Sequence, residues 1–322
     1  NAGADAHNIA VGYDAGLSIT TGIRNVIIGG IAGDALTDAD FNVGIGYQSL
    51  TGDTKGSKST AVGYRTLANQ NFSTSTDSLN TAVGADAGLS VTTGIQNTLI
   101  GAETADALTE GSRNVAVGRN ALSADTLGSR STALGRNSLS SQNFTTATDS
   151  NNVAVGYNSG ASVTTGVQNI LIGNEAGDAL TDADKNVAVG YQALSSDTLG
   201  SNSTAIGRGA LFAQNFTTAT DSFNTAVGAD AGNQVTTGDS NTLIGGLAGD
   251  ALTEGDSNVA VGTNALGADT KGDRNIAIGA GTLETQNFTT KTDSYNVGVG
   301  HAAGSSVTTG IFNTLIGGLA GD

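Results

Sequence analysis

Asn80-Thr81-Ala82-Val83-Gly84 is one copy of a five-residue phrase, Asn-x-x-(Val/Ile)-Gly, that recurs along the whole chain. The fourth residue of the phrase is Val, Ile or Leu in all eighteen copies. An aliphatic residue at one fixed point of every repeat is typical of a column of stacked core residues. The phrase therefore predicts a solenoid in which each copy forms a short strand that ends at its glycine.

The spacing of the phrases defines the repeat. They begin at Asn8, Asn25, Asn42, Ser59 and Asn80, so three coils of 17 residues precede one of 21, and four coils make a block of 72. The block starts again at Asn152, Asn224 and Asn296. We expect an all-β parallel β-solenoid of about 18 coils. It would run through residues 1–322 as one continuous domain, a segment of a longer fibrous chain.

Composition agrees with a stack of short strands and tight turns. The chain has 48 Gly, no Pro, Cys, Met or Trp, and 4% aromatic residues, which is too few large side chains for an ordinary globular core. Its formal net charge of -16 would repel a phosphate backbone, so we expect no nucleic-acid partner. Without any apolar run of sufficient length, we also expect no membrane span.

Strand alternation divides the phrase into two faces. The second and fourth residues share one face, which we assign to the interior. The third residue then points outward, yet it is never charged and is large in the second coil of every block: Ile27, Leu99, Leu171, Leu243 and Leu315. A strand that is apolar on both faces is usually covered on both. We therefore expect copies of the chain to associate through this third column. A second short strand is expected at residues 15–19 and 32–36.

Two phrases, Asn80-Thr81-Ala82-Val83-Gly84 and Asn186-Val187-Ala188-Val189-Gly190, carry a family resemblance. They resemble the head repeats of YadA-type trimeric autotransporter adhesins and the repeats of bacteriophage and bacterial tail-fibre proteins. The resemblance implies a left-handed β-roll, three chains side by side, and binding to a matrix or host surface. It also implies an extracellular location, on a cell surface or a virion. The coils here are longer than those of the adhesin heads.

The 21-residue coils carry the most distinctive insertion. Each contains an Asn-Phe-Ser or Asn-Phe-Thr sequence that matches the N-x-[ST] glycosylation motif, beginning at Asn71, Asn143, Asn215 and Asn287. We expect these loops to protrude once per block. The asparagines are candidate glycan acceptors. The alternative is a longer turn whose phenylalanine fills a lateral gap.

Acidic turns are weak candidates for a calcium site, because carboxylate oxygens suit this ion. The residues are Asp34, Asp38 and Asp40, repeated 144 positions later, two blocks on, as Asp178, Asp182 and Asp184. Apart from calcium, no cofactor is expected.

Other site chemistry is sparse in the sequence. The chain has no Cys and only two histidines, His7 and His301, and no spacing typical of a nucleophile and its base. We therefore expect no enzymatic activity. A threonine column that includes Thr20, Thr37 and Thr54 raises ice binding as a less favoured function.

Taken together, these patterns indicate a non-enzymatic extracellular fibre or adhesin segment, a stiff rod that presents loops for surface attachment. Its partners would be further copies of itself, in a trimer or a filament, and a receptor or glycan on a host surface. The alternative is a purely structural filament or tail-fibre shaft.

Overall fold

The structure, a computed structural model, describes residues 5–322. They form an all-β parallel β-solenoid of about 18 turns, about 17 residues apart, which confirms the expected fold class. The described residues contain no helix, and so none that could cross a membrane. By contacts the chain divides into two compact units, Asn1–Thr165 and Gly166–Asp322, which are described separately below.

Each unit has one three-residue strand per coil. The strands of the first unit are β1 (Ile9–Val11), β2 (Val26–Ile28), β3 (Val43–Ile45), β5 (Thr60–Val62), β7 (Thr81–Val83), β8 (Thr98–Ile100), β9 (Val115–Val117), β11 (Thr132–Leu134) and β13 (Val153–Val155). Those of the second are β14 (Ile170–Ile172), β15 (Val187–Val189), β17 (Thr204–Ile206), β19 (Thr225–Val227), β20 (Thr242–Ile244), β21 (Val259–Val261), β23 (Ile276–Ile278), β25 (Val297–Val299) and β26 (Thr314–Ile316).

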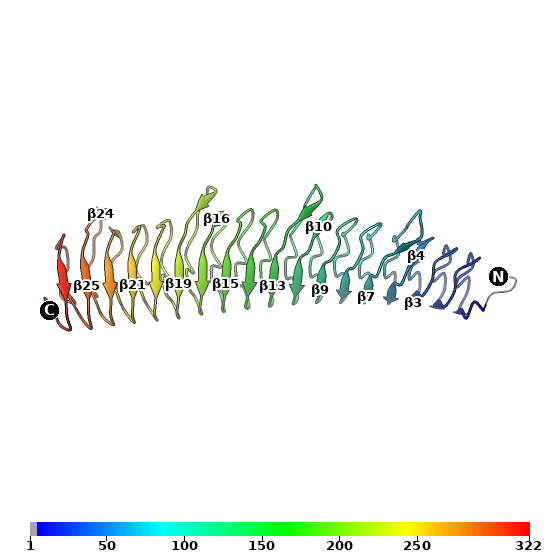
Figure 1. Cartoon of the computed structure of the whole chain (residues 1–322), viewed down its shortest axis with the longest axis horizontal. Helices are drawn as coiled ribbons and strands as arrows, with labels where there is room; N and C mark the ends of the chain where they lie inside the picture. Colours follow the sequence, from blue (N-terminus) through cyan, green and yellow to red (C-terminus); the bar gives the residue numbers. More distant parts are fainter. Residues whose placement is uncertain (1–4) are drawn as a thin grey trace. The chain divides into compact units, whose positions relative to one another are not determined.

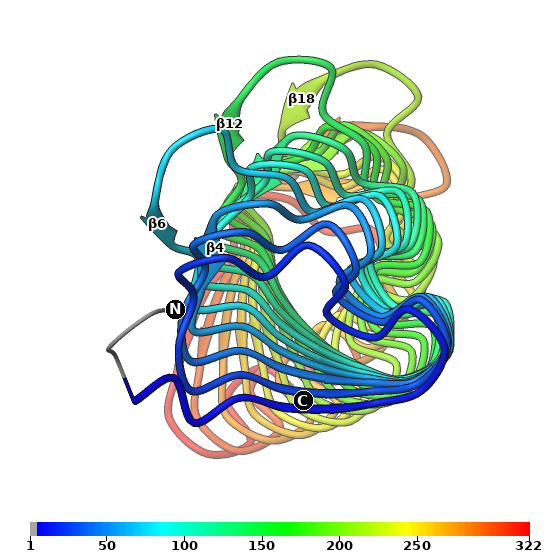
Figure 2. The same cartoon turned by 90° about the vertical axis from the view of Figure 1, so that its right-hand side faces the viewer.

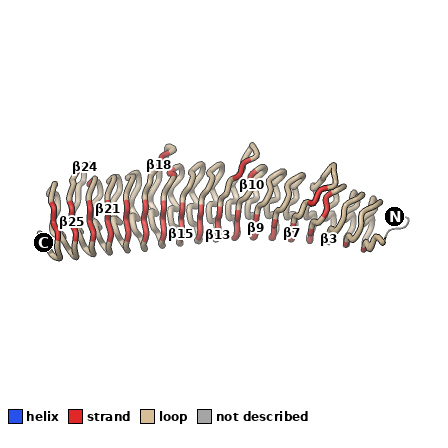
Figure 3. Tube along the Cα trace, in the orientation of Figure 1, coloured by secondary structure: helices blue, strands red, loops and turns tan. Residues whose placement is uncertain are grey.

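Within a unit the strands pair in parallel and in register, residue for residue of the repeat. Ile9 pairs with Val26 and Val26 with Val43, so equivalent residues form columns along the stack. Figure 1 and Figure 3 show the strands of each unit as one row, with turns making up most of the rest of each coil. Below, position 1 is the Asn or Ser that starts each phrase, and position 0 is the residue just before it.

Within residues 5–322, short two-residue strands pair only where a 21-residue coil follows a 17-residue one. In the first unit β4 (Gly56–Ser57) pairs with β6 (Thr76–Asp77), and β10 (Gly128–Ser129) with β12 (Thr148–Asp149). In the second unit β16 (Gly200–Ser201) pairs with β18 (Thr220–Asp221), and β22 (Gly272–Asp273) with β24 (Thr292–Asp293).

The position-1 asparagines close the coils from inside. Asn25 is fully buried, and its Nδ2 donates to the carbonyl oxygen of Ala39 at 2.8 Å, across its own coil. Its Oδ1 accepts from the backbone N–H of Asn42, in the next coil, at 2.9 Å. A buried amide of this kind is stabilising because both its donor and its acceptor are satisfied. In the coils that carry it, this Asn therefore joins the two ends of a coil and joins one coil to the next.

The expected assignment of the strand faces is wrong. The third residue of the phrase is the interior one: Ile27, Leu99, Leu171 and Leu243 have no exposed surface, and Leu315, in the last coil, is partly buried. These side chains therefore do not form a face between copies. The second and fourth residues point outward. The reason is that positions 1 and 3 share a face by alternation, and the hydrogen bonds of the asparagine require position 1 inside.

The expected second strand is also absent, since residues 15–19 and 32–36 form turns. Asp14 has φ of 52° and Gly16 has φ of 63°, so left-handed residues alternate here with ordinary ones. Such residues end an extended strand because they turn the chain sharply.

Across the interior of the second, third and fourth coils of each block, a large side chain at one of positions 3 and 9 faces a small residue at the other. Where position 3 is large, as at Leu171 or Ile27, position 9 on the opposite wall is Gly177 or Gly33. A Cβ on Gly177 would lie 2.7 Å from a methyl carbon of Leu171. Where position 9 is leucine, position 3 is Ala or Gly. The narrow interior therefore admits one large side chain across this line, as close packing requires.

Candidate functional site

The loops of the 21-residue coils are the most distinctive surface feature of each unit. Figure 2 shows the loops that lead to β6 and β12, and separately the loop that leads to β18, extending beyond the outline of the neighbouring coils. The expected acceptor residues Asn71, Asn143, Asn215 and Asn287 are all exposed on these loops.

A buried phenylalanine anchors each loop. Phe72, Phe144, Phe216 and Phe288 are only 5–7% exposed. The ring of Phe72 packs against Gly56, where a Cβ would lie 2.8 Å from its Cδ2. The phenylalanine therefore fills the gap beside the loop. Asn71 itself remains at the surface.

A buried carboxylate holds the backbone of the same loop. Asp53 Oδ1 accepts from the N–H groups of Gly56 at 2.9 Å and Phe72 at 3.4 Å. Its Oδ2 accepts from Nε2 of Gln70 at 2.5 Å. The same arrangement recurs at Asp125, Asp197 and Asp269. Each loop therefore projects from a fixed base.

The cluster around this carboxylate is fully buried and has no positive charge within it. Ser59 and Ser78 share a hydrogen bond of 2.5 Å, and Gln70 Oε1 accepts from Nδ2 of Asn80 at 2.9 Å. Desolvation by burial raises the pKa of Asp53, and likewise that of Asp125, above the usual value. This cluster was not expected from the sequence. The signal was present: position 12 is Asp in the third coil of every complete block and Gln in the fourth.

Polar pairs link the C-terminal end of each loop to the adjacent coil. Lys58 Nζ lies 2.5 Å from Asp77, and Arg130 lies 2.7 Å from Asp149. Arg274 pairs with Asp293, and Asn202 donates to Asp221 at 2.7 Å. These contacts are exposed, and each contributes little on its own.

Asn71 is oriented by its neighbour in the preceding coil. Its Oδ1 accepts from Oγ1 of Thr54 at 3.0 Å, and the same hydroxyl lies 2.8 Å from the carbonyl oxygen of Phe72. The hydroxyl-bearing residues that follow, Ser73 and Thr74, are exposed. The loop thus presents the oriented amide of Asn71 and two exposed hydroxyl side chains to the solvent.

The acidic turns do not converge. Asp34 accepts from Thr51 Oγ1 at 2.6 Å, whereas Asp40 accepts from the backbone N–H of Ile23 at 2.8 Å. Asp38 lies 3.9 Å from Lys55 Nζ. Within residues 5–322 no three acidic, His or Cys side chains gather in a group that could hold a metal ion.

The second acidic turn has one unusual member. Asp184 accepts from the N–H of Val167 at 2.8 Å, as Asp40 does for its own neighbour, and Asp182 is exposed. Asp178 differs, because its Oδ1 is buried without a hydrogen-bond partner. Burial, together with the nearby charge of Glu175, raises the pKa of Asp178 to about 6.

The threonine column is used within the fold. Oγ1 of Thr37 donates to the carbonyl oxygen of Thr54 at 3.0 Å, and Oγ1 of Thr109 donates to that of Thr126 at 2.9 Å. These hydroxyls therefore extend the hydrogen bonding between coils. His7 and His301 are both exposed.

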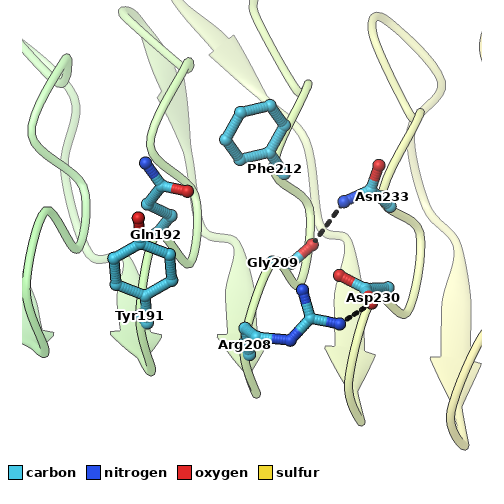
Figure 4. A pocket seen from close by; sticks show the side chains of 7 residues that line it. All are labelled: Tyr191, Gln192, Arg208, Gly209, Phe212, Asp230 and Asn233. Atoms are coloured by element: carbon cyan, nitrogen blue, oxygen red, sulfur yellow. Dashed lines mark hydrogen bonds and ion pairs between the residues drawn. The ribbon is translucent and has the colours of Figure 1, made fainter.

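A shallow hollow of about 200 Å³ lies on three adjacent coils of the second unit. Figure 4 shows Arg208 directed toward Asp230, with which it forms an ion pair, and Asn233 bonded to the carbonyl oxygen of Gly209. The hollow exists because Gly209 has no side chain where the neighbouring coils carry Gln192 and Asp230. Small-molecule sites usually enclose roughly 300 Å³ or more, so this hollow is small for one.

No family model matches the chain, and no curated protein has a matching sequence.

Proposed function

We propose that this chain is a non-enzymatic segment of an extracellular fibre or adhesin whose long coils present loops for attachment to a surface. The observation that carries the proposal is the recurrence, once per block, of the same exposed loop on the same buried anchor. An anchor of one phenylalanine and one carboxylate fixes the loop, which lowers the entropy lost on binding. Its exposed amide and hydroxyl groups suit a glycan or a polar receptor surface.

Repetition supports attachment for a second reason. Four loops of nearly identical sequence offer four weak contacts on one chain. Once one loop is bound, the next binds at a high effective concentration. Weak individual contacts thus add up to stable attachment, and no single deep pocket is needed.

Self-association is the second part of the proposal, with a trimer as the favoured assembly. The outward residues at positions 2 and 4 are Val, Ile, Leu or Thr in every coil, and Ile170 and Ile172 are 40% and 38% exposed. An apolar sheet face of this regularity favours coverage by another protein surface. Light scattering that finds a monodisperse monomer would contradict this part.

Shortening the loops tests the attachment function. Deletion of residues 73–76, and of their equivalents in the other three long coils, leaves coils of 17 residues, the length that the chain already uses elsewhere. We expect attachment to cells or matrix-coated surfaces to be lost while the circular dichroism spectrum remains that of a β-solenoid. Replacement of Ser73 and Thr74 by alanine at unchanged loop length removes only the hydroxyl groups and is expected to weaken attachment without affecting the fold.

The same experiment separates the two candidate functions. Loss of attachment with folding intact supports an adhesin. Unchanged attachment of the loop-deleted chain would contradict attachment through the loops. A native chain that does not attach at all would support a purely structural shaft, in which the loops only complete the stack.

A further inference from the structure

The outward sheet face has a charge distribution unlike that of the rest of the molecule. Positions 0 to 6 of the coils contain nine of the 13 Lys and Arg residues and none of the 29 Asp and Glu residues. The cations are Arg24, Lys58, Arg113, Arg119, Arg130, Arg136, Lys185, Arg208 and Arg274. The face is therefore apolar at its centre, with six cations at position 0 and three at position 6, although the chain has a net charge of -16.

The two edges of this face differ in charge. Position 0, at the start of the strand, holds six of the cations. Position 7, just past the other end, holds five acids against a single Arg65: Asp14, Asp86, Glu103, Glu175 and Asp230. Asp86, Glu103 and Asp230 each pair with an arginine of their own chain, whereas Asp14 and Glu175 form no ion pair within residues 5–322. Seven residues of largely extended chain place the two edges about 20 Å apart. A parallel second copy would therefore meet a cationic edge with an acidic one. An antiparallel copy would bring two cationic edges together, which is repulsive.

Three of the position-0 cations are not compensated within their own chain. Lys58, Arg130 and Arg274 each form an ion pair with an aspartate of the adjacent long coil. In residues 5–322, by contrast, Arg24, Arg113 and Lys185 have no carboxylate within 4.0 Å. Arg24 lies over the ring of Phe41, and Arg113 donates to Gln96. All three are exposed and available to a neighbouring chain.

The rise of the coil limits the possible registers. Copies related by closed rotational symmetry lie at equal height. The chain rises about 4.8 Å along the solenoid axis with each coil. Position 0 of a coil therefore lies, in height, between position 7 of the preceding coil and position 7 of the same coil on the neighbouring copy. For the three uncompensated cations, the preceding coil offers Asp14, Glu103 and Glu175. Their own coils offer Ile31, Asn120 and Gln192 instead.

We propose that copies of this chain associate in parallel, with the position-0 edge of one against the position-7 edge of the next. Each uncompensated cation then faces the acid ten positions earlier in the numbering: Arg24 faces Asp14, Arg113 faces Glu103, and Lys185 faces Glu175. The inference rests on the self-association in the proposed function and adds the register to it.

The remaining position-0 cations agree with this register. Lys58, Arg130 and Arg274 face the amides of Gln48, Asn120 and Asn264, whereas the other register sets Lys58 against Arg65. One contact in this register is unfavourable, because Arg130 of one copy lies near Arg119 of the next copy. Both of these arginines have a carboxylate on their own chain, Asp149 and Glu103 respectively.

Cysteine pairs test the register directly, because the native chain has no Cys. Arg113→Cys and Glu103→Cys chains, mixed before assembly and oxidised with glutathione, are expected to form a disulfide-linked dimer of one copy of each. A bond within one chain is impossible, because each variant carries a single cysteine. The matched control is Arg113→Cys mixed with Asn120→Cys, which tests the other register and is expected to give at least fivefold less cross-linked product.

Charge exchange in the second unit supplies an independent readout. Lys185→Glu and Glu175→Lys are each expected to weaken self-association severalfold, as measured by sedimentation at low salt. The double variant exchanges the two charges and is expected to restore association. A high salt concentration should reduce these differences, because the pairs are exposed at the rim of the interface.

The outcomes separate this inference from the proposal on which it depends. A monomeric native chain in light scattering overturns both. A native oligomer in which the Asn120 pair cross-links as well as the Glu103 pair, or in which the double charge variant fails to recover, overturns the register alone.

Discussion

At the scale of single residues, the glycine that ends each strand is the position least able to change. Gly46 has φ of +135°, and a Cβ there would lie 2.2 Å from the carbonyl oxygen of Gly63 in the next coil. Both the backbone conformation and the close approach of the next coil exclude a side chain. The repeat therefore requires glycine for two separate reasons.

Substitution of this glycine should be strongly destabilising. Gly46→Ala is expected to cost about 3 kcal/mol or more and to lower the midpoint of thermal unfolding by several degrees. Gly30→Ala is the matched control: its φ is not positive, and its nearest neighbour would be Tyr47 Cδ2 at 3.4 Å. Equal melting temperatures for the two variants would contradict this account.

Asp178 predicts a pH dependence of stability. Its folded-state pKa of about 6 lies above the reference value of 3.8, because burial disfavours the charged form. The stability that the protonated group contributes is present in full below about pH 4 and is lost as the pH rises through 6. Asp178→Asn should therefore melt at a higher temperature than the native chain at pH 8, with the difference shrinking toward pH 4.

A control in the same column makes this test specific. Asp34 occupies the equivalent position in the first block, but its carboxylate accepts a hydrogen bond from Thr51. Asp34→Asn should not raise the melting temperature at pH 8. If both variants behaved alike, the unpartnered buried oxygen of Asp178 would not be the cause.

At the scale of the strand, neighbouring residues have opposite roles. Leu243 in β20 is fully buried, whereas Ile244 points outward and is 39% exposed. Leu243→Ala should lower the free energy of unfolding by about 2–5 kcal/mol, because it leaves a cavity in a narrow interior. Ile244→Ala should cost about 1 kcal/mol or less in the isolated chain. Chemical denaturation of both variants checks the assignment, and a larger loss for Ile244→Ala would reverse it.

The long loops predict a similar contrast between two phenylalanines. Phe144 is 5% exposed at the base of its loop, and Phe223, at position 0, is 59% exposed. Phe144→Ala should destabilise the chain by about 3–5 kcal/mol and increase proteolysis within residues 145–148. Phe223→Ala should change the melting temperature by about 1 °C or less, as surface substitutions usually do.

At the scale of the whole molecule, the outward face should decide the state of association. Ile206 is 38% exposed on this face, so Ile206→Lys should fold normally yet shift the oligomer toward monomer in light scattering. Ala219→Lys adds the same charge to a loop, where the next block already has Lys291, and should leave association unchanged. Dissociation by both variants would indicate a general effect of charge.

The sequence by itself determined the architecture, because a solenoid is defined by its period. The spacing of the phrases gave coils of 17 and 21 residues, and the structure has strands at the same places, from β1 to β26. The exposed loops at Asn71 and its equivalents were also predictable, since an insertion into a stacked coil has no room inside. These inferences depend only on counting along the chain.

Only the tertiary structure decided which side of the strand is the interior. Alternation places Asn25 and Ile27 on one face of the strand and Val26 and Ile28 on the other. When both faces carry apolar or small residues, alternation does not show which face is the interior. The interior face is fixed by contacts across the coil, namely the hydrogen bond of Asn25 to Ala39 and the packing of Ile27 beside Gly33. Both join residues that are distant in sequence. For the same reason, the buried Asp53 cluster became apparent only once coil closure had brought its members together.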